Sequence, residues 1–353
     1  MKYLRLILLP FGYLYGFIVE GIKLTYRLGW CKSSRFELPT IIIGNLSTGG
    51  TGKTPHVEYI LKNLGHQFTI AVLSRGYGRK TKGFMWVEPT DAAADVGDEP
   101  LQVRKKYPKN AVVVAEKRAA AIPKILNKLP QTQLLLLDDG MQHWPVIGDS
   151  YIMLTTYSSP FFNDFVLPAG NLREFRFNYR RSNTIIVTKC PPNINEQQRA
   201  AFLKKIKPGN KQKVYFSYMK YGQPYHILET ERVLKWEALL SINILLVVGI
   251  ANPKPLKKYL SAHSKSVQLF SVPDHHNYSQ EEWKAVLQKF DAIESSLGAT
   301  IIISTEKDAL RLIPFVSDIN IPLYIVPIEI AFAFGEDDAF QRTLIEVIDK
   351  KIG

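Results

Sequence analysis

Eight consecutive residues combine glycines, a lysine and threonines in a pattern that suits phosphate binding. They are Ser47, Thr48, Gly49, Gly50, Thr51, Gly52, Lys53 and Thr54. The general phosphate-loop pattern is G-x-x-x-x-G-K-[ST], so serine replaces its first glycine here. Glycines let successive backbone N–H groups turn toward phosphate oxygens, the lysine reaches the β- and γ-phosphates, and the last threonine ligates Mg²⁺. The segment therefore predicts a binding site for a nucleoside triphosphate with Mg²⁺.

The neighbours of this loop supply the structural context that the pattern requires. The β-branched run TIIIG (40–44) precedes it, and a helical pattern extends from Lys53 to about Asn63. A strand, a glycine-rich turn and a helix are expected, with the positive end of the helix dipole pointing at the phosphates. A glycine-rich turn without nucleotide is the alternative. The adjacent lysine and threonine favour the nucleotide.

A second group of chemically active residues follows the apolar run LLLL (134–137). Asp138 and Asp139 stand directly after it. Two carboxylates are costly to bury unpaired, so a nearby cation is the expected reason for their position. A phosphate-loop site also needs an acid at the end of a neighbouring strand to hold the metal or its water shell. Spacing does not choose between the two acids, and a simple strand-end turn is the alternative.

Further apolar runs indicate the fold that positions these residues. They occur at 68–74, 111–115, 151–156 and 184–189, with helical stretches between them, and a second series begins near Ile242. Such continuous runs are typical of parallel strands buried on both faces. We expect an α/β fold: a P-loop NTPase-like parallel sheet flanked by helices, a second smaller α/β lobe and an N-terminal membrane-associated helix. The expected segments are the N-terminal helix 1–30, the kinase core 31–210, a connection 211–236, the second lobe 237–336 and a C-terminal helix 337–353.

The N-terminal segment is apolar with charged flanks. Residues 6–19 carry no charge, whereas Lys2 and Arg5 precede them and Lys23 and Arg27 follow. Fourteen such residues are fewer than the roughly 18 that a membrane span needs. A helix lying in the membrane surface, with basic residues at anionic lipid, is therefore expected. The alternative is a helix packed on the core.

The overall charge favours an anionic partner. Lys and Arg number 45 against 32 Asp and Glu, a formal net charge of +13. A nucleic acid, an acidic membrane and a phosphorylated substrate all suit that charge. No recognisable aromatic and basic nucleic-acid module occurs, so nucleic acid is not expected. Only Cys31 and Cys190 are present, which suits a reducing compartment.

Several segments together resemble the tetraacyldisaccharide 4'-kinase family, which phosphorylates a lipid A precursor at the inner membrane of Gram-negative bacteria. They are IIGNLSTGGTGKTP (42–55), LSRGYGR (73–79), VGDEP (96–100), LLDDGMQHW (136–144), LPAGNLRE (167–174), VTK (187–189), PDHHNY (273–278) and STEKDA (304–309). Asn171 is a departure, since many relatives have proline there. The resemblance implies transfer of the ATP γ-phosphate to the 4'-hydroxyl of an acylated glucosamine disaccharide 1-phosphate, yielding lipid IVA. It implies ATP and Mg²⁺, a lipid substrate, no required protein partner and the cytoplasmic face of the inner membrane.

The resemblance also implies a catalytic pair. Asp98 in VGDEP takes the position of the family's catalytic aspartate, which accepts the proton of the acceptor hydroxyl. His275 in PDHHNY is paired with it, and His276 is the rival for that role.

Other polar residues are candidates for substrate binding. Arg75, Arg79 and Arg173 could bind a substrate phosphate or the transferred phosphoryl group, because a planar guanidinium suits both. Gln142 and His143 could orient the metal shell or the acceptor. Surface arginines without such a role are the alternative for each.

A different class of protein shares part of this pattern. A P-loop ATPase that acts as a switch or assembly factor at the membrane would keep the loop and the paired aspartates. It would need no acceptor base. Formation of phosphorylated lipid rather than free phosphate distinguishes the two.

Overall fold

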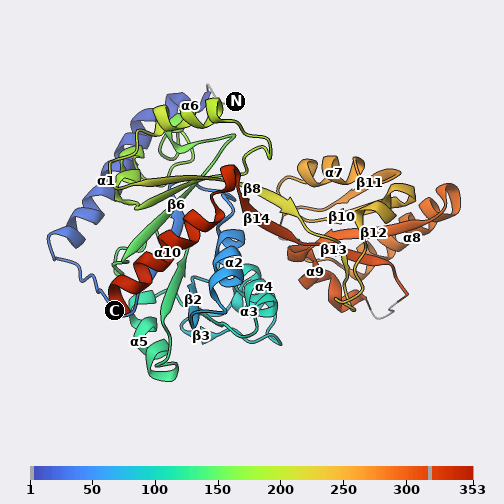
Figure 1. The fold of residues 1–353 in the computed structure, drawn as a ribbon, viewed down its shortest axis with the longest axis horizontal. Helices are drawn as coiled ribbons and strands as arrows, with labels where there is room; N and C mark the ends of the chain where they lie inside the picture. Colours follow the sequence, from blue (N-terminus) through green and yellow to red (C-terminus); the bar gives the residue numbers. More distant parts are fainter. Residues whose placement is uncertain (1–3, 275, 317–319, 353) are drawn as a thin grey trace. The chain divides into compact units, whose positions relative to one another are not determined.

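The computed structural model describes residues 4–274, 276–316 and 320–352. The chain divides into two compact units: unit 1 comprises Met1–Met219 and Ile330–Gly353, and unit 2 comprises Lys220–Glu329. The chain passes between them in strands β8 (Lys213–Tyr221) and β14 (Ile328–Phe332), which are neighbours in one sheet (Figure 1). These bounds differ from the expected segments. Much of 211–219 is strand rather than connection, and the chain has re-entered unit 1 by 330.

Unit 1 is built on a sheet that, in the described residues, has nine strands in the order β14-β8-β7-β6-β1-β5-β2-β4-β3. Strand β1, which leads into the phosphate loop, lies between β5 and β6 and is parallel to both. Its branched residues are buried on both faces, which favours a central strand. The parallel sheet expected from the apolar runs is confirmed. The bounds are β1 Thr40–Asn45, β2 Ile70–Ser74, β3 Met85–Trp86, β4 Ala111–Val114, β5 Leu134–Asp138, β6 Ser150–Thr156 and β7 Thr184–Thr188.

Helices cover this sheet. The C-terminal helix α10 belongs to unit 1, where Phe340 is fully buried against Tyr59 of α2 and Phe332 of β14. The Tyr59 hydroxyl also donates to Asp337 at 3.0 Å. The helices are α2 Lys53–Leu64, α3 Ala93–Val96, α4 Asp98–Lys106, α5 Arg118–Lys128, α6 Glu196–Ile206 and α10 Asp337–Ile352, with short 3₁₀ turns at Phe161–Asn163, Arg176–Arg181 and Ala333–Gly335.

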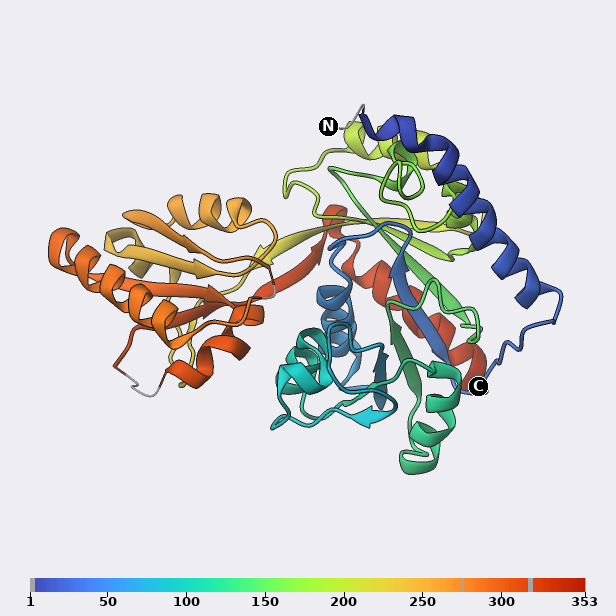
Figure 2. The same cartoon turned by 180° about the vertical axis from the view of Figure 1, so that it is seen from behind.

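The N-terminal helix lies along unit 1, beside the segment 164–178 (Figure 2). A 3₁₀ turn, Leu4–Leu8, leads into α1, Leu9–Arg27. Among the described residues, Arg5–Arg27 alone is long and apolar enough to cross a membrane by length and composition. Of an apolar stretch of 18 residues within it, 17% is buried. The helix is longer than the uncharged run because it continues through Glu20 and Lys23.

Unit 2 is the second α/β lobe that the sequence predicts. Its sheet, as far as the structure describes it, has the order β11-β10-β12-β13-β9. The strands are parallel except β9, which pairs antiparallel with β13. The elements are β9 Tyr225–His226, β10 Asn243–Val248, β11 Ser266–Ser271, β12 Thr300–Thr305, β13 Leu323–Val326, α7 Lys254–Ser261, α8 Gln280–Leu297 and α9 Glu306–Leu312, with 3₁₀ turns at Trp236–Ser241 and Ile313–Phe315.

Candidate active site

The phosphate loop is an open turn between β1 and α2. Gly49 and Gly52 have φ of +104° and +88°, a region that glycine adopts without steric cost. A Cβ added at Gly49 or Gly50 would meet nothing within 4 Å. Lys53 is the first residue of α2, so the free N–H groups of its first turn face the loop. The loop is therefore neither collapsed nor filled by side chains.

Side chains from the ends of two parallel strands hold the loop in this shape. Asn45 donates from Nδ2 to Thr51 Oγ1 at 3.0 Å, and Thr188 donates from Oγ1 to the Thr51 carbonyl at 2.8 Å. Lys189 donates from Nζ to the Gly50 carbonyl at 2.6 Å. The bonds from Thr188 and Lys189 occupy the carbonyls of Thr51 and Gly50, and the loop also bonds to itself, since the Thr51 N–H donates to the Gly49 carbonyl at 3.1 Å. Such preorganisation is what an anion site requires.

The segment 164–173 supports the loop from the other side. Thr48 N–H donates to the Asn171 carbonyl at 2.7 Å, and Arg173 N–H donates to the Leu46 carbonyl at 2.7 Å. Together the two segments enclose a polar cavity of about 160 Å³. We call it the phosphate cavity; its lining includes the loop residues 47–51, Asp164 and Asn171.

Lys53, Asp139, Arg173 and Gln142 form one polar cluster beside the loop. Lys53 Nζ lies 3.6 Å from Asp139 Oδ1. Arg173 Nη1 lies 3.3 Å from the same oxygen and donates to Gln142 Oε1 at 3.2 Å. Gln142 Nε2 in turn donates to the Asn45 carbonyl at 2.9 Å. Lys53, Asp139, Arg173 and Gln142 are thus brought together where β5 ends and α2 begins.

Asp138 ends β5 and is almost fully buried. Burial raises the pKa of its carboxyl to about 6, and the Lys53 ammonium opposes the rise. Its Oδ1 has no hydrogen-bond partner among the described residues. A buried carboxylate oxygen without a partner, beside a helix that presents Thr54, fits a hard cation such as Mg²⁺. The described residues contain no group of three or more acidic, His or Cys side chains that could hold a metal unaided.

Arg118 is a member of this site that the sequence did not single out. It begins α5 and is 2% exposed, and its Nη1 donates to the Asp139 carbonyl at 2.9 Å. Its charge also stabilises the ionised form of Asp138. The sequence feature that could have identified Arg118 is its position soon after β4, at the same edge of the sheet as the phosphate loop.

Arg75 and His143 are close enough for the charge of Arg75 to act on His143. Burial, together with the charges of Arg118 and Arg75, lowers the pKa of His143 to about 4. His143 is therefore neutral at pH 7. Arg75 is exposed, so its guanidinium faces solvent where a substrate phosphate could reach it.

Arg79, in contrast, is engaged away from the phosphate loop. Its side chain is 2% exposed and forms an ion pair with Glu116. Its Nη2 also donates to the Gly83 carbonyl at 2.5 Å. Burial and pairing give Arg79 a structural role without a substrate.

Asp98 is the first residue of α4, and Gly97 before it has φ of +94°. A Cβ on Gly97 would lie 3.2 Å from the Tyr77 carbonyl, so the SRGYGR and VGDEP segments touch at this point. The charge of the next residue, Glu99, raises the pKa of Asp138. The main cause of that raised pKa is burial of Asp138, and Glu99 at the start of α4 is near enough to add to it.

His275 lies outside the described residues. His276 is described, and its Nε2 lies 2.8 Å from Glu282 Oε2. Glu282 also forms a capping box with Ser279 at the start of α8. His276 thus helps to fix a helix end in unit 2, whereas Asp98 belongs to unit 1.

Glu174 is a second residue that the sequence did not single out. It is fully buried and accepts hydrogen bonds from Arg181 Nη2 at 2.6 Å and Gln142 Nε2 at 2.7 Å. Glu174 therefore fixes the side-chain amide of Gln142, which also contacts Arg173. The signal was an acid at the end of the LPAGNLRE segment.

His56 braces the phosphate loop from within α2. Its Nδ1 lies 2.7 Å from the Gly52 carbonyl and must donate, so Nε2 accepts from the Ser217 hydroxyl at 3.0 Å. This fixes the neutral tautomer. Burial lowers the pKa of His56 to about 4, and the bond to Gly52 opposes the shift.

We expect His56 to make the protein less stable in mild acid. In the unfolded chain His56 takes up a proton near pH 6.5, whereas in the folded chain it stays neutral until the pH falls to about 4. This contribution is complete above the unfolded pKa and is lost as pH falls toward the folded pKa. Between pH 7 and 5 the loss is about 2 kcal/mol. His56→Asn keeps a donor for Gly52 and should show a smaller decrease in urea unfolding free energy over that interval. Equal decreases would rule out His56 as the cause.

Comparisons with known proteins agree along the whole chain. The model of the family described as tetraacyldisaccharide-1-P 4'-kinase (LpxK) matches residues 4–349. A relative from Flavobacterium johnsoniae, named tetraacyldisaccharide 4'-kinase, is 36% identical over 352 residues, which cover 100% of this chain and 99% of the relative. A relative of the same name from Bacteroides thetaiotaomicron is 37% identical over 350 residues, covering 96% and 92%.

A solved structure agrees with the fold. The crystal structure of LpxK from Aquifex aeolicus in complex with ATP superposes with a TM-score of 0.75 at 25% identity, covering 98% of this chain and 99% of that one. Sequence relatives and structural neighbour thus match over the phosphate loop, the acidic strand end and both units. This chain belongs to the tetraacyldisaccharide 4'-kinase family.

Proposed function

We propose that this chain transfers the γ-phosphate of ATP to the 4'-hydroxyl of a tetraacylated glucosamine disaccharide 1-phosphate, yielding lipid IVA. Membership of the family carries this proposal, because related kinases of the same name match nearly the full length. The open loop beside Lys53 and the acids of β5 is the local feature that suits phosphoryl transfer.

Residues 47–54 are the proposed nucleotide site. Their N–H groups would bind the phosphates, and Lys53 would move from Asp139 to the β- and γ-phosphates. Thr54 and one of Asp138 and Asp139 would hold Mg²⁺, which when bound neutralises charge on the phosphates. The orphaned Asp138 Oδ1 supports Asp138 as that ligand. Arg118 donates a hydrogen bond to the Asp139 carbonyl and would thereby hold both acids at this edge of the sheet.

Asp98 is the proposed base for the acceptor hydroxyl. The charge of Glu99 contributes to the raised pKa of Asp138, which supports a position of α4 near the reacting phosphate. His275 is the proposed partner of Asp98, and engagement of His276 with Glu282 favours His275 over its neighbour. Arg75 and Arg173 remain proposed phosphate contacts, with Gln142 and His143 beside them.

The test of the proposed function is transfer of label. The full chain is incubated with γ-labelled ATP, Mg²⁺ and the acylated disaccharide 1-phosphate in detergent micelles, and the products are separated into lipid and free phosphate. Label in the lipid is expected. Label in free phosphate alone would contradict the proposal and favour a P-loop ATPase switch or assembly factor at the membrane.

Membrane association at the cytoplasmic face is proposed from α1. Its buried residues, Gly12, Gly16 and Lys23, face unit 1, while many of its large apolar side chains are exposed. The exposed residues of α1 include Phe11, Leu14, Phe17, Ile18, Ile22 and Leu24, and Ile7 before the helix and Leu28 after it are exposed as well. A helix that packs on its own protein by one side and exposes apolar residues on the other suits a peripheral, monotopic anchor.

Deletion of residues 1–30 is therefore expected to release the protein from membranes. Removal of the exposed apolar face abolishes the main contact with lipid. The measurement is sedimentation with vesicles that contain anionic phospholipid, compared between the full chain and the truncated chain. Circular dichroism checks that the truncated chain is folded. Unchanged sedimentation of the folded, truncated chain would contradict the anchor.

A further inference from the structure

The N-terminal helix contains a buried ion pair that contact with a membrane does not explain. Lys23 of α1 is 4% exposed, and its Nζ lies 3.2 Å from Glu20 Oε2. Lys23 also donates to the side-chain oxygen of Asn178, and the side-chain amide of Asn178 donates to Glu20. A lysine that served only to meet anionic lipid would lie on an exposed side of the helix. Here the three polar side chains satisfy one another where α1 meets unit 1.

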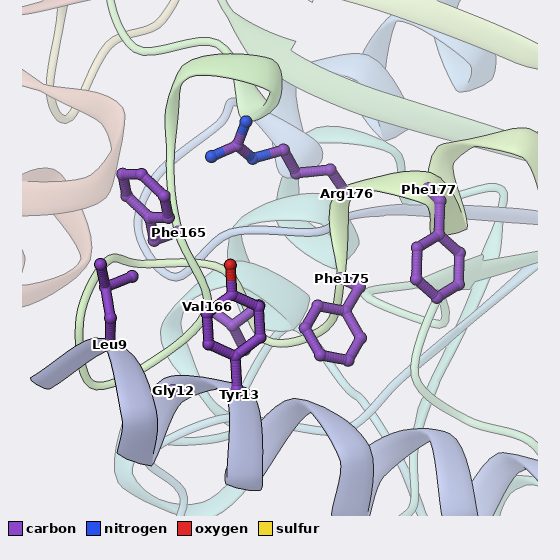
Figure 3. A pocket seen from close by; sticks show the side chains of 8 residues that line it. All are labelled: Leu9, Gly12, Tyr13, Phe165, Val166, Phe175, Arg176 and Phe177. Carbon is purple, nitrogen blue, oxygen red and sulfur yellow. The ribbon is translucent and has the colours of Figure 1, made fainter.

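Close packing holds this side of α1 against unit 1. A Cβ on Gly12 would lie 3.0 Å from the Val166 carbonyl, so a larger residue would require the backbone to move. Tyr13 lies beside Phe175, with ring centroids 6.2 Å apart (Figure 3). The buried residues of α1 continue along the helix to the ion pair. The start of the helix is thus held by apolar contacts and its later turns by the buried charges.

Trp144 and Arg181 continue this contact into unit 1. Lys23 Nζ lies 5.7 Å from the centroid of the Trp144 ring, and Cζ of Arg181 lies 4.9 Å from the same centroid. Asn178, which binds Lys23, and Arg181 belong to one 3₁₀ turn, Arg176–Arg181. A displacement of Lys23 would therefore act on Arg181 in two ways, through the indole ring and through the backbone of this turn.

Arg181 also reaches the polar cluster beside the phosphate loop. Its two terminal nitrogens donate to the two carboxylate oxygens of Glu174, which is fully buried. Such a bidentate pair fixes both the place and the plane of the guanidinium. Glu174 accepts from Gln142 at 2.7 Å, and Gln142 Oε1 accepts from Arg173 at 3.2 Å. A continuous series of polar contacts thus joins α1 to Arg173, which lies 3.3 Å from Asp139 Oδ1.

We propose that Lys23 of α1 is a positioning residue, which acts through Arg181 to hold Arg173 beside the phosphate loop. The part of this inference that makes Arg173 a phosphate contact rests on the proposed function. The helix then has two separate roles: its exposed side binds the membrane, and its buried side orders the site. A misplacement of about 1 Å that originates far from the chemistry can lower a rate by about 10²-fold, so a contact at this distance is enough to matter.

Lys23→Met and Arg27→Met form a matched pair for the test. Both remove one positive charge from α1, but Lys23 is buried whereas Arg27, one turn later, is exposed. We expect Lys23→Met to lower the kcat of transfer to the acylated acceptor by about tenfold and Arg27→Met to leave it close to that of the wild type. Lys23→Met should sediment with anionic vesicles like the wild type, because the buried lysine does not contact lipid.

A second variant guards against loss of the fold. Lys23→Met alone leaves the Glu20 carboxylate without its partner, which destabilises a buried site, whereas Lys23→Met/Glu20→Gln removes both charges at a smaller cost. We expect the double variant to unfold near the wild-type temperature and still to show the tenfold loss of kcat. Wild-type kcat in this folded variant would overturn the proposal. A loss of kcat that only parallels a loss of sedimentation would also overturn it, because membrane binding would then be the cause.

A double-mutant cycle with Arg173→Gln tests the route. If Lys23 acts through Arg173, Lys23→Met should lower kcat in the wild-type background and have little further effect when Arg173 is already replaced. An equal loss in both backgrounds would contradict the proposal, because the two residues would then act independently.

Affinity for ATP with Mg²⁺, measured by calorimetry without acceptor, separates this inference from the proposed function. If the wild type transfers label to the lipid, the cycle on kcat decides the role of Lys23. If it transfers none, the proposed function is wrong, and the same cycle is measured on the affinity for ATP. We then expect Lys23→Met to weaken that affinity only while Arg173 is present. Equal weakening in both backgrounds, or none in either, would overturn the positioning role.

Discussion

Lys53→Ala is expected to lower the kcat of lipid phosphorylation by at least 10²- to 10³-fold, the usual effect of removing one group that stabilises transition-state charge. The side chain is 17% exposed and its Nζ lies 3.6 Å from Asp139 Oδ1, so it is largely covered and lies beside the acids that follow β5. Its loss removes the charge that would meet the phosphates and leaves Asp139 with Arg173 alone. The measurement is steady-state transfer of label from ATP to the acylated acceptor.

Lys62→Ala is the matched control for this substitution. Lys62 is exposed in the last turn of the same helix, α2, far along the chain from the loop. Both variants should unfold at temperatures close to that of the wild type. Turnover of Lys53→Ala at the wild-type rate would remove Lys53 from the mechanism, and a similar loss in both variants would point to damage of α2 instead.

The phosphate loop could be predicted because its determinants are local. A branched run, three glycines and a lysine at the start of a helix specify a strand, a turn and a helix without reference to other parts of the chain. The observed β1 and α2, Thr40–Asn45 and Lys53–Leu64, agree with that prediction. The capping box of Ser279 and Glu282 at the start of α8 depends on local residues in the same sense.

The sequence predicts an acid from a neighbouring strand beside the loop, but the other contacts around the loop could not be predicted because they depend on strand order. Asp139 meets Lys53 only because β5 lies next to β1 in the sheet. The buried pair of Glu174 and Arg181, and its link through Gln142, joins segments that are distant in sequence. Spacing along the chain contains no information about such contacts.

Arg75 and Arg79 show the same limit within one motif. They are four positions apart in SRGYGR, and no local feature distinguishes one from the other. The structure exposes Arg75 and buries Arg79 against Glu116, which follows β4. Which arginine is available to a substrate therefore depends on a contact between separate segments.

The unit boundaries also depend on pairing between distant segments. Residues 211–236 are rich in polar residues and tyrosine, which favours a connection, yet 213–221 form β8 beside β7. Strand β14 returns next to β8 more than a hundred residues later. A strand that completes a sheet begun earlier in the chain has no local sequence signal that distinguishes it from a connecting loop.

Asp98 is suited to a test because asparagine can replace it at the start of α4. It begins α4 after Gly97, whose positive φ sets the turn. A carboxylate at a helix N-terminus is stabilised by the helix dipole. Asn has nearly the same shape and also suits a helix start, so Asp98→Asn should preserve the fold while removing the ability to accept a proton.

We therefore expect Asp98→Asn to lower kcat by about 10²- to 10⁴-fold, the range for loss of a general base. Affinity for ATP, measured by calorimetry without acceptor, should change little, because the base acts on the acceptor hydroxyl rather than on the nucleotide. Asp95→Asn, an exposed acid in the preceding short helix, is the control and should retain wild-type turnover. If Asp98→Asn kept wild-type kcat, proton transfer would have to be assigned to another group. If it lost ATP affinity as well, Asp98 would belong to the nucleotide site instead.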